Sequence, residues 1–344
     1  MIIFVGLAIG ALAASFWLTA VLRRYALSRS LLDIPNSRSS HSRPTPRGGG
    51  VAIVLSFLAA LVVLWGGNGA STADCLAVVG AGGGVAIIGF MDDHGHVAAR
   101  WRLIGHFAAA AWALFWLGGW PTLTVFGFPL ELGWVGTCIG LLYLVWMLNL
   151  YNFMDGIDGI AGVEALSVCL GACLLYGLAG YFSAIWMPLL LALSAAGFLL
   201  WNFPPARIFM GDAGSGFLGV VLGTFSLAAA GLEGAFFWSW LILLGVFIVD
   251  ATVTLMRRLF RGEKVHEAHR SHAYQYASRH FGRHLPVTLG VLAINFGWLL
   301  PIALLVSYQQ LEGVVGLSLA YAPLVVLVLK FHAGKREADV RMNE

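Results

Sequence analysis

The sequence predicts an all-α, polytopic membrane protein with about eleven transmembrane helices, and three observations support this fold class. Of its 344 residues, 59% are hydrophobic and only 11% are charged, whereas charged residues make up about a quarter of a soluble globular chain. Apolar runs of about 20 residues, the length that crosses a bilayer core as a helix, recur along the chain. The 13 Trp and 43 Gly residues also suit a membrane protein, since Trp anchors at bilayer interfaces and Gly lets helices approach closely.

The apolar runs follow one another from the first residues onward. The first run has its charges after it rather than before it, so we expect a retained span and not a cleaved signal peptide. Gly180 marks the short turn at which we divide the long apolar stretch 160–201 into two spans. The predicted spans are 2–22, 49–66, 74–91, 103–119, 133–149, 160–179, 181–201, 214–230, 235–256, 287–307 and 313–331.

The positions of Lys and Arg predict how these spans are oriented. All 20 of these residues fall on one side of the predicted membrane, and the other side carries acids without a cation: Asp74, Glu131, Glu233 and Glu312. Because basic loops are retained in the cytoplasm, we expect the basic side to be cytoplasmic. Eleven spans then place the N-terminus outside and the C-terminus inside.

The unusual polar stretches all fall on this cytoplasmic side. They are "DIPNSRSSHSRPTPRGGG", "MDDHGH", "NFMDGIDG", "NFPPARIFMGDAGSG" and "HEAHRSHAYQ". The outer connections are short and carry no comparable motif. We therefore expect a single integral membrane domain, residues 1–331, with a cytoplasmic cleft, and a basic tail, residues 332–344, near anionic lipid.

Five carboxylates belong to these stretches: Asp92, Asp93, Asp155, Asp158 and Asp212. Carboxylates gathered at one surface repel one another unless cations hold them, which predicts Mg²⁺ or Mn²⁺ together with nearby Arg side chains. Each motif taken alone could be an ordinary solvated turn, because Asp and Gly are common turn residues. Their occurrence on one face favours a site.

The stretch "FMGDAGSG" is the most specific of the acidic motifs. Its glycines permit close backbone approach, and Gly214, Ser215 and Gly216 at a helix start could offer free N–H groups to a phosphate. The alternative for Asp212 is a plain N-cap role.

Histidines and arginines supply the positive counterpart. His266, His269 and His272 are spaced by three residues beside Arg270. This spacing is compatible with zinc, with a solvated amphipathic helix, or with a segment that grips phosphate. The Pro- and Gly-rich loop that carries Arg38 and Arg47 could likewise serve an anionic substrate or lipid headgroups.

A metal, phosphates and a polar face on a membrane suit phosphoryl transfer between a lipid and a soluble substrate. The five stretches, from about residue 33 to 276, resemble in order and topology the polyprenyl-phosphate N-acetylhexosamine-1-phosphate transferases. The histidine motif looks more like that of the O-antigen-initiating branch than that of the peptidoglycan enzyme. The resemblance implies a multi-pass enzyme of the bacterial inner membrane, with its N-terminus periplasmic, that requires Mg²⁺.

The resemblance also implies the substrates. The enzyme would move a sugar-1-phosphate from a UDP-N-acetylhexosamine to undecaprenyl phosphate and release UMP. Members of the family are often homodimers, and no nucleic-acid partner is expected. The donor could be UDP-N-acetylfucosamine or UDP-N-acetylquinovosamine, as the branch suggests, or UDP-N-acetylglucosamine, and the product would begin an O-antigen or another lipopolysaccharide or cell-wall glycan.

Site roles follow from motif position in the resemblance. Asp212 would be the metal ligand, together with Asn152, and Asp92 and Asp93 would lie where the lipid phosphate binds. The diphosphate would face His269, Arg270 and His272. The nucleotide side would comprise Asn152, Asp155, Gly156, Ile157, Asp158 and Phe209, with Phe209 stacked on the base.

A direct displacement is the mechanism that we expect. The lipid phosphate is already anionic at neutral pH, so neutralising charge matters more than a general base. The rival mechanism uses Asp93 as a base or as a nucleophile. Asp250, an acid within the predicted span 235–256, is a further functional candidate; the alternative is a helix-to-helix hydrogen bond to a Ser or Thr.

Two other classes of protein share part of this pattern. A transporter would have similar spans but polar residues near mid-bilayer. A metal-dependent lipid phosphatase would share the carboxylates without needing a nucleotide pocket.

Overall fold

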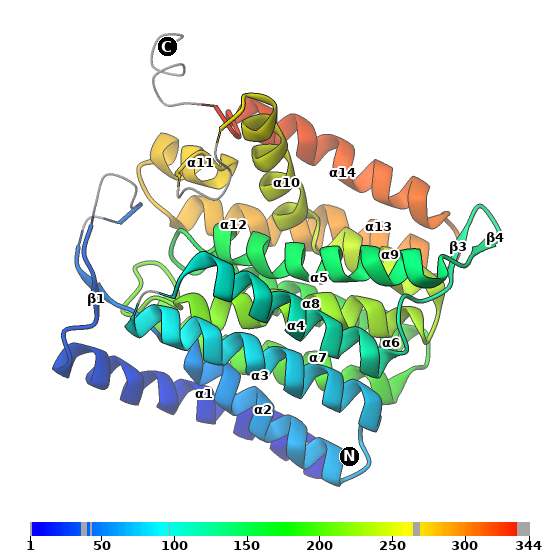
Figure 1. Cartoon of the computed structure of the whole chain (residues 1–344), viewed down its shortest axis with the longest axis horizontal. Coiled ribbons are helices and arrows are strands. Elements are labelled where there is room, and N and C mark those ends of the chain that lie inside the picture. The colour runs from blue at the N-terminus through cyan, green and yellow to red at the C-terminus, as the bar shows by residue number, and fades with distance from the viewer. Residues whose placement is uncertain (1, 36–39, 42, 96, 264–268, 336–344) are drawn as a thin grey trace.

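The computed structural model describes residues 2–35, 40–41, 43–95, 97–263 and 269–335, and it is a bundle of helices (Figure 1). The first half contains α1 Ile2–Ser28, α2 Val51–Gly66, α3 Thr72–His94, α4 Ala99–Leu117, α5 Gly133–Met154, α6 Ile160–Leu178 and α7 Trp186–Asn202. The second half contains α8 Asp212–Ala230, α9 Gly234–Leu243, α10 Gly245–Phe260, α11 Ala273–Phe281, α12 Leu285–Ile294, α13 Leu300–Ser307 and α14 Gly313–Lys330. A 3₁₀ turn, η1 Phe182–Ile185, precedes α7, and a π-helical turn, η2 Asn295–Leu299, joins α12 to α13.

The predicted fold class, an all-α polytopic membrane protein, is confirmed. Each of the eleven predicted spans falls on a helix or on consecutive helices. Within the described residues, eight helices are long and apolar enough to cross a membrane, and the pair α9–α10 makes a ninth if it is counted as one span. Because α2 has 16 residues and α4 is outside this set, the number eleven and the orientation stay predictions.

The predicted span 235–256 is not one straight helix. It divides into α9 and α10, which meet at an angle of 69°, and α10 turns away from the bundle axis in Figure 1. The apolar run alone could not reveal this bend, since hydropathy reports which residues leave water and not the direction of the helix axis.

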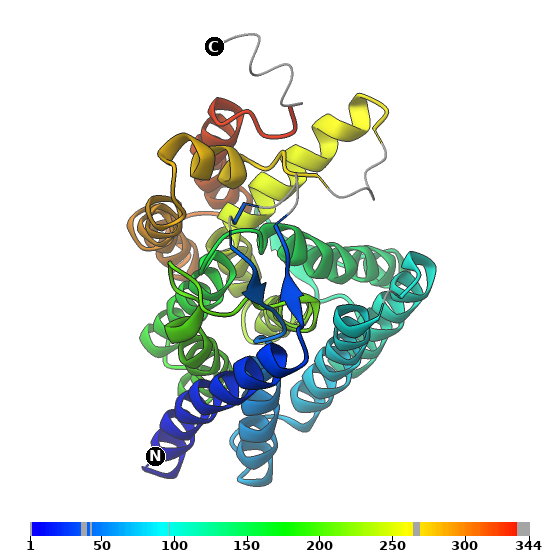
Figure 2. The ribbon, with the colours of Figure 1, turned by 90° about the vertical axis from the view of Figure 1, so that its left-hand side faces the viewer.

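Small residues let α8 lie at the centre of the bundle, which Figure 2 views along the helices. Of the α8 span, 89% is buried inside the protein. A Cβ at Gly219 would lie 2.5 Å from the Met147 carbonyl oxygen of α5, and one at Gly223 would lie 3.0 Å from Leu144. Glycines four residues apart therefore bring two backbones together, as in other membrane helix pairs.

Two short antiparallel sheets lie at opposite ends of the bundle (Figure 1). The strands β1 Leu32–Asp33 and β2 Thr45–Pro46 pair with Leu32 opposite Pro46, and β3 Leu123–Val125 pairs with β4 Phe128–Leu130. The end that carries β1 and β2 also carries the polar stretches singled out in the sequence.

The first residues of the predicted tail pack against the protein. Ala333 is buried, its carbonyl oxygen accepts a hydrogen bond from Arg257 Nη1 at 2.8 Å, and the Gly334 N–H donates to the Ser271 carbonyl oxygen at 2.6 Å. Residues 336–344 lie outside the described residues, so the division into a domain of residues 1–331 and a tail stays a prediction.

Candidate active site

A cleft of about 400 Å³ opens at the polar end of the bundle, and all five polar stretches contribute to its wall. The predicted site residues that line it are Arg47, Asp93, Asn152, Asp155, Gly156, Ile157, Asp158, Phe209, Asp212 and His269. These residues come from sequence positions more than 200 apart. The topology therefore brings together what the charge distribution had placed on one face.

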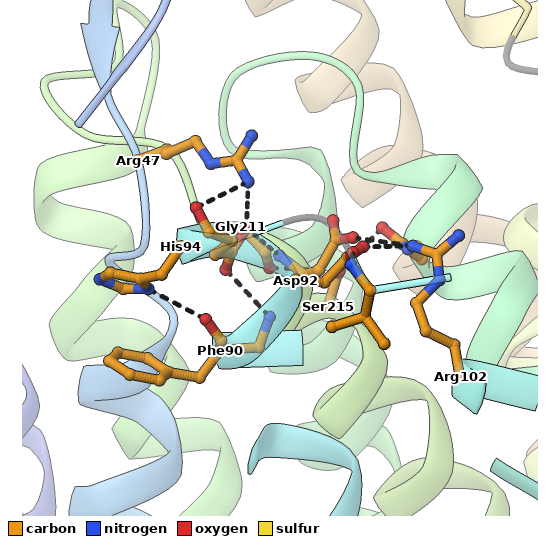
Figure 3. A network of polar contacts seen from close by, with 12 residues as sticks. Arg47, Phe90, Asp92, His94, Arg102, Gly211 and Ser215 are labelled. Carbon is orange, nitrogen blue, oxygen red and sulfur yellow. Dashed lines mark hydrogen bonds and ion pairs between the residues drawn. The ribbon is translucent and has the colours of Figure 1, made fainter. Parts of the chain in front are cut away.

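Asp93, near the end of α3, occupies the N-terminus of α8. Its carboxylate accepts hydrogen bonds from the N–H groups of Asp212 at 3.2 Å and Ala213 at 3.3 Å, and from Arg47 Nη2 at 2.8 Å (Figure 3). A helix N-terminus favours an anion through its free N–H groups and its dipole. Gly211, with φ +79°, allows this approach, since a Cβ there would lie 2.7 Å from Asp93 Oδ2.

This geometry corrects two expectations for "FMGDAGSG". The interpretation of Gly214 and Ser215 as free donors for a phosphate is wrong, because both N–H groups donate to the Gly211 carbonyl oxygen at 3.1 Å. The N-cap alternative for Asp212 is wrong as well. Gly211 is the N-cap, and the Asp212 side chain lies in the first turn of α8, where it is available to the cleft.

The Asp92 side chain has different partners from that of Asp93. Its Oδ1 accepts from the Val97 N–H at 2.9 Å, and its Oδ2 accepts from Arg102 Nη1. The same Nη1 lies 3.8 Å from Asp212 Oδ2, so one guanidinium serves two carboxylates (Figure 3). Asp92 is not among the residues that line the main cleft; together with Asn152 and Asp212 it lines a small cavity of about 20 Å³ behind it.

The loop after α5 forms a second wall of the cleft. Asn152 Oδ1 accepts from Ser215 Oγ at 3.1 Å, and Asp158 Oδ2 accepts from the Ala206 N–H at 3.0 Å. Asp158 Oδ1 lies 3.1 Å from His284 Nδ1. The Phe209 ring contacts the His41 ring edge-on, with the ring centroids 4.8 Å apart.

The surroundings of Asp155 favour a bound cation. Within the described residues no hydrogen bond or ion pair holds its side chain. Burial raises the pKa of Asp155 well above its usual range, and the negative charges of Asp212, Asp93 and Asp158 raise it further. A cation among these groups would relieve the repulsion that the protein alone leaves uncompensated.

The donor set suits a hard divalent ion. Within the described chain no three His, Cys, Asp or Glu side chains converge at metal-ligand spacing, so a closed zinc-type site is not formed there. Mg²⁺ is typically held by one or two carboxylates together with substrate phosphates and water. Asp212, Asn152 and Asp155 offer such oxygens, and the residues present therefore fit Mg²⁺ or Mn²⁺.

The histidine segment contributes less directly than expected. His269 lines the cleft. Burial lowers its pKa to about 3, with His272 and Arg258 as further causes, so its ring is neutral at pH 7 and offers hydrogen bonds rather than charge. Its Nδ1 lies 2.9 Å from Ser271 Oγ.

His272 and Arg270 are not among the residues that line the cleft. His272 is 2% exposed and its ring stacks behind that of His269, with the centroids 4.9 Å apart. The helix α11 begins at Ala273, so the amphipathic-helix alternative does not hold for His269, Arg270 and His272, which precede it. Arg38 and His266 lie outside the described residues.

The sequence matches known proteins across this site. The model of glycosyl transferase family 4 matches residues 75–230, which include Asp92, Asp93, Asp155, Asp158 and Asp212. The phospho-N-acetylmuramoyl-pentapeptide-transferase of Pelotomaculum thermopropionicum is 30% identical over 72% of this chain and 82% of its own length. The chain belongs to glycosyl transferase family 4. It is a membrane-bound phospho-sugar transferase of the polyprenyl-phosphate hexosamine-1-phosphate transferase superfamily, as the motifs indicated.

Two further relatives of this family 4 transferase cover most of its length. The decaprenyl-phosphate N-acetylglucosaminephosphotransferase of Mycolicibacterium smegmatis is 29% identical over 91% of this chain and 85% of its own. The probable undecaprenyl-phosphate N-acetylglucosaminyl 1-phosphate transferase of Bacillus subtilis is 27% identical over 75% of this chain and 72% of its own.

The cleft also contains residues that the sequence analysis did not assign to the site, among them His41, Asn202, Gln275 and His284, and Arg102 lines the small cavity behind it. Arg102 belongs to the general excess of cytoplasmic cations, although its place in the first turn of a mostly apolar helix, soon after "DD", is a signal. His284 stands immediately before α12 and could have been singled out in the same way. His41 and Gln275 line the cleft but carry no local signal.

Proposed function

We propose that this transferase moves an N-acetylhexosamine-1-phosphate from a UDP-sugar to undecaprenyl phosphate at the cytoplasmic face of the bacterial inner membrane and releases UMP. The observation that carries the proposal is the cleft itself. It brings Asp155 and Asp212 together at the polar end of the α-helical bundle, where burial and the negative charge of Asp212 raise the pKa of Asp155. Relatives named for transfers to undecaprenyl or decaprenyl phosphate support the same lipid class here.

A divalent cation, Mg²⁺ or Mn²⁺, belongs to the proposal. Asp212 and Asn152 would hold it, as the family pattern implies, and the geometry adds Asp155. When bound, the ion would neutralise phosphate charge during the transfer.

Direct displacement is the chemistry that the residues support best. An oxygen of the lipid phosphate attacks the phosphorus that bears the sugar, the bond between this phosphorus and the bridging oxygen of the diphosphate breaks, and UMP leaves with that oxygen and the electron pair. The Asp93 side chain is 3% exposed, pairs with Arg47 and accepts two N–H groups. Both oxygens of this carboxylate already accept hydrogen bonds, so we assign Asp93 to positioning Arg47 and α8.

The walls of the cleft suggest how the donor lies. Gly156, Ile157, Asp158 and Phe209 would hold the uracil on one side, and His269 would donate a hydrogen bond to the diphosphate. Arg47, whose side chain is 37% exposed and bonds Asp93, belongs to the loop of residues 43–50 and lines the cleft. It can contact the lipid phosphate without leaving Asp93.

The identity of the sugar is the finer part of the proposal. UDP-N-acetylglucosamine is the first donor to test, because the relatives of M. smegmatis and B. subtilis are named for N-acetylglucosamine. UDP-N-acetylfucosamine and UDP-N-acetylquinovosamine are the alternatives that the histidine motif favours. The product would initiate O-antigen or another cell-envelope glycan, and a homodimer remains part of the proposal.

The test is a panel of UDP-sugars offered to the purified protein with undecaprenyl phosphate and Mg²⁺. We expect UMP release that requires both substrates, and formation of a lipid diphosphate sugar by mass spectrometry. UMP release without lipid, or a phosphorylated Asp92 or Asp93, would overturn direct displacement. Release of inorganic phosphate from the lipid would indicate a phosphatase, and flux of the UDP-sugar without UMP formation would indicate a transporter.

A further inference from the structure

Asp250 of α10 lies outside the cleft and makes four polar contacts within the described residues. It is 2% exposed. Its Oδ1 accepts from the Ala273 N–H at 3.0 Å and from Thr254 Oγ1 at 3.1 Å, and lies 3.3 Å from His272 Nδ1. Its Oδ2 accepts from the Tyr274 N–H at 3.0 Å.

These bonds tie the start of α11 to α10. The N–H groups of Ala273 and Tyr274 are among those that an α-helix leaves without a partner in its first turn. Asp250 satisfies both, and a carboxylate is favoured there by the helix dipole. The bond to Thr254 lies within α10, so it is not the helix-to-helix bond that was the alternative for Asp250. The other three contacts reach α11 and His272, the residue before it.

The segment that Asp250 holds reaches both walls of the cleft. Through His272, it supports His269, whose ring stacks on that of His272. Through Tyr274, it reaches the last turn of α5, because Tyr274 Oη donates to the Phe153 carbonyl oxygen at 2.9 Å. The contact is tight: a Cβ at Gly156 would lie 2.1 Å from Tyr274 Oη.

We propose that Asp250 is a positioning residue that sets the distance between the histidine wall and the nucleotide-side wall of the cleft. The proposal rests on the proposed function, since it assigns these two walls to the diphosphate and to the nucleotide. Asp250 acts through His272 and Tyr274 and does not contact substrate.

The chemistry of the four partners requires a carboxylate at this position. Each partner is a donor, and an ionised carboxylate is an acceptor on both oxygens. An Asn side chain would turn an NH₂ group toward at least one of these donors. His272 Nδ1 can donate to Asp250 Oδ1 in the tautomer that carries a proton on Nδ1, which a neighbouring carboxylate favours.

Asp250→Asn is the first test, with Asp74→Asn as the matched control. Asp74 lies near the start of α3 at the other end of the bundle and bonds Ser71. For Asp250→Asn we expect kcat/KM for the UDP-sugar to fall by about tenfold to a hundredfold, the range typical of a lost supporting hydrogen bond. The KM for undecaprenyl phosphate should stay unchanged. In Asp74→Asn, both kcat/KM for the UDP-sugar and the KM for undecaprenyl phosphate should equal the wild-type values.

A merely structural role gives a different pattern. Loss of correctly folded protein lowers kcat and leaves both KM values unchanged, whereas a displaced nucleotide wall raises the donor KM alone. Unaltered donor kinetics in Asp250→Asn, or equal changes in both KM values, would overturn the proposal.

Tyr274→Phe keeps the test decisive if Asp250→Asn does not fold. It removes only the hydroxyl that bonds the Phe153 carbonyl oxygen, so we expect a raised donor KM and an unchanged lipid KM. Wild-type donor kinetics in this variant would contradict the proposal that Tyr274 links Asp250 to the nucleotide-side wall.

Hydrogen–deuterium exchange separates this inference from the proposed function. If Asp250 links the two walls, amides of 269–276 and of 152–158 exchange faster in Asp250→Asn than in Asp74→Asn, whether or not any UDP-sugar is turned over. Unchanged exchange over 152–158 would refute the link. Absence of turnover by the wild-type protein with every donor would refute the proposed function instead.

Discussion

The backbone of Gly89 in α3 touches that of Asp212 at the start of α8. A Cβ at position 89 would lie 2.6 Å from the carbonyl carbon and oxygen of Asp212, and 2.6 Å from the Ala213 nitrogen. Gly89 lies one helical turn before Asp92 and Asp93. The contact therefore sets how closely the acids of α3 approach the N-terminus of α8, and with it the spacing of the cleft.

Gly89→Ala should consequently impair both activity and stability. The atoms in the way are backbone atoms, so α3 and α8 must separate. Overpacking of this kind costs about 1–3 kcal/mol, and a displacement of about 1 Å in a catalytic site can cost about a hundredfold in rate. UMP release and the thermal midpoint in detergent measure the two effects.

Gly83→Ala is the control for this prediction, since it lies on the same helix and a Cβ there meets nothing within 4 Å. It should retain wild-type activity. Equal activity of the two variants would show that the contact between α3 and α8 does not set the geometry of the site.

Arg102→Gln should lower turnover and, at the same time, strengthen cation binding. The change leaves the Asp92 side chain, which is 10% exposed, without the guanidinium that pairs with it. It also removes a positive charge 3.8 Å from Asp212. We expect turnover to fall at least about tenfold, equivalent to about 1.4 kcal/mol, and the apparent KM for Mg²⁺ to decrease.

Arg100→Gln provides the comparison for Arg102, because Arg100 is exposed and its guanidinium lies over the Trp101 ring at 5.6 Å. Kinetics titrated with Mg²⁺ distinguish the two. If Arg102→Gln behaved like Arg100→Gln, the pairing with Asp92 and Asp212 would have no part in the reaction.

The sequence predicted the helices and the acidic residues of the cleft well, for a physical reason. A bilayer leaves a spanning chain few options other than helices, and the side on which Lys and Arg gather decides which loops share a face. Asp93, Asp155, Asp158 and Asp212 could therefore be assigned to one site before the packing of the helices was known.

The remaining parts of the site depend on packing that no local pattern encodes. Arg102 meets Asp212 because α3, α4 and α8 pack side by side. His272 turns away from the cleft because α10 bends by 69° from α9 and brings Asp250 beneath it. Side-chain partners of this kind follow from the angle between helices, which hydropathy does not report.

The pair of His284 and Asp158 should make stability depend on pH. Burial lowers the pKa of His284, but the Asp158 side chain, together with the Ser40 carbonyl oxygen, raises it more, so the net shift is upward. The protonated ring can donate to Asp158 Oδ1 at 3.1 Å and to the Ser40 carbonyl oxygen at 3.0 Å. A pKa raised in the folded state stabilises the fold below the unfolded value of about 6.5, and this stabilisation is lost as pH rises through the folded pKa.

Thermal midpoints of wild type and His284→Gln, measured from pH 5.5 to pH 9, check this sign. The wild-type advantage should be largest at low pH and shrink as pH rises. His280→Gln, at an exposed position of α11, should give no such trend. An advantage that stayed constant or grew with pH would contradict the pairing.

Asp212→Asn should abolish the cation-dependent reaction while leaving the fold intact. The Asp212 N–H still donates to Asp93 after the change, because that bond uses the backbone, so α8 keeps its N-terminal anion. What is lost is one of the carboxylates that Asp155 faces in the cleft, and with it the charge that would hold a divalent ion. Loss of a preorganised electrostatic group costs about 10²–10³ in rate, and we expect UMP release to fall at least that far.

EDTA should abolish UMP release by the wild type and leave the residual rate of Asp212→Asn unchanged. The control variant Asp74→Asn should respond to EDTA as the wild type does. Retained Mg²⁺-dependent turnover in Asp212→Asn would place the cation elsewhere, and Asp155→Asn, which keeps Asp212, would then be the variant to lose it.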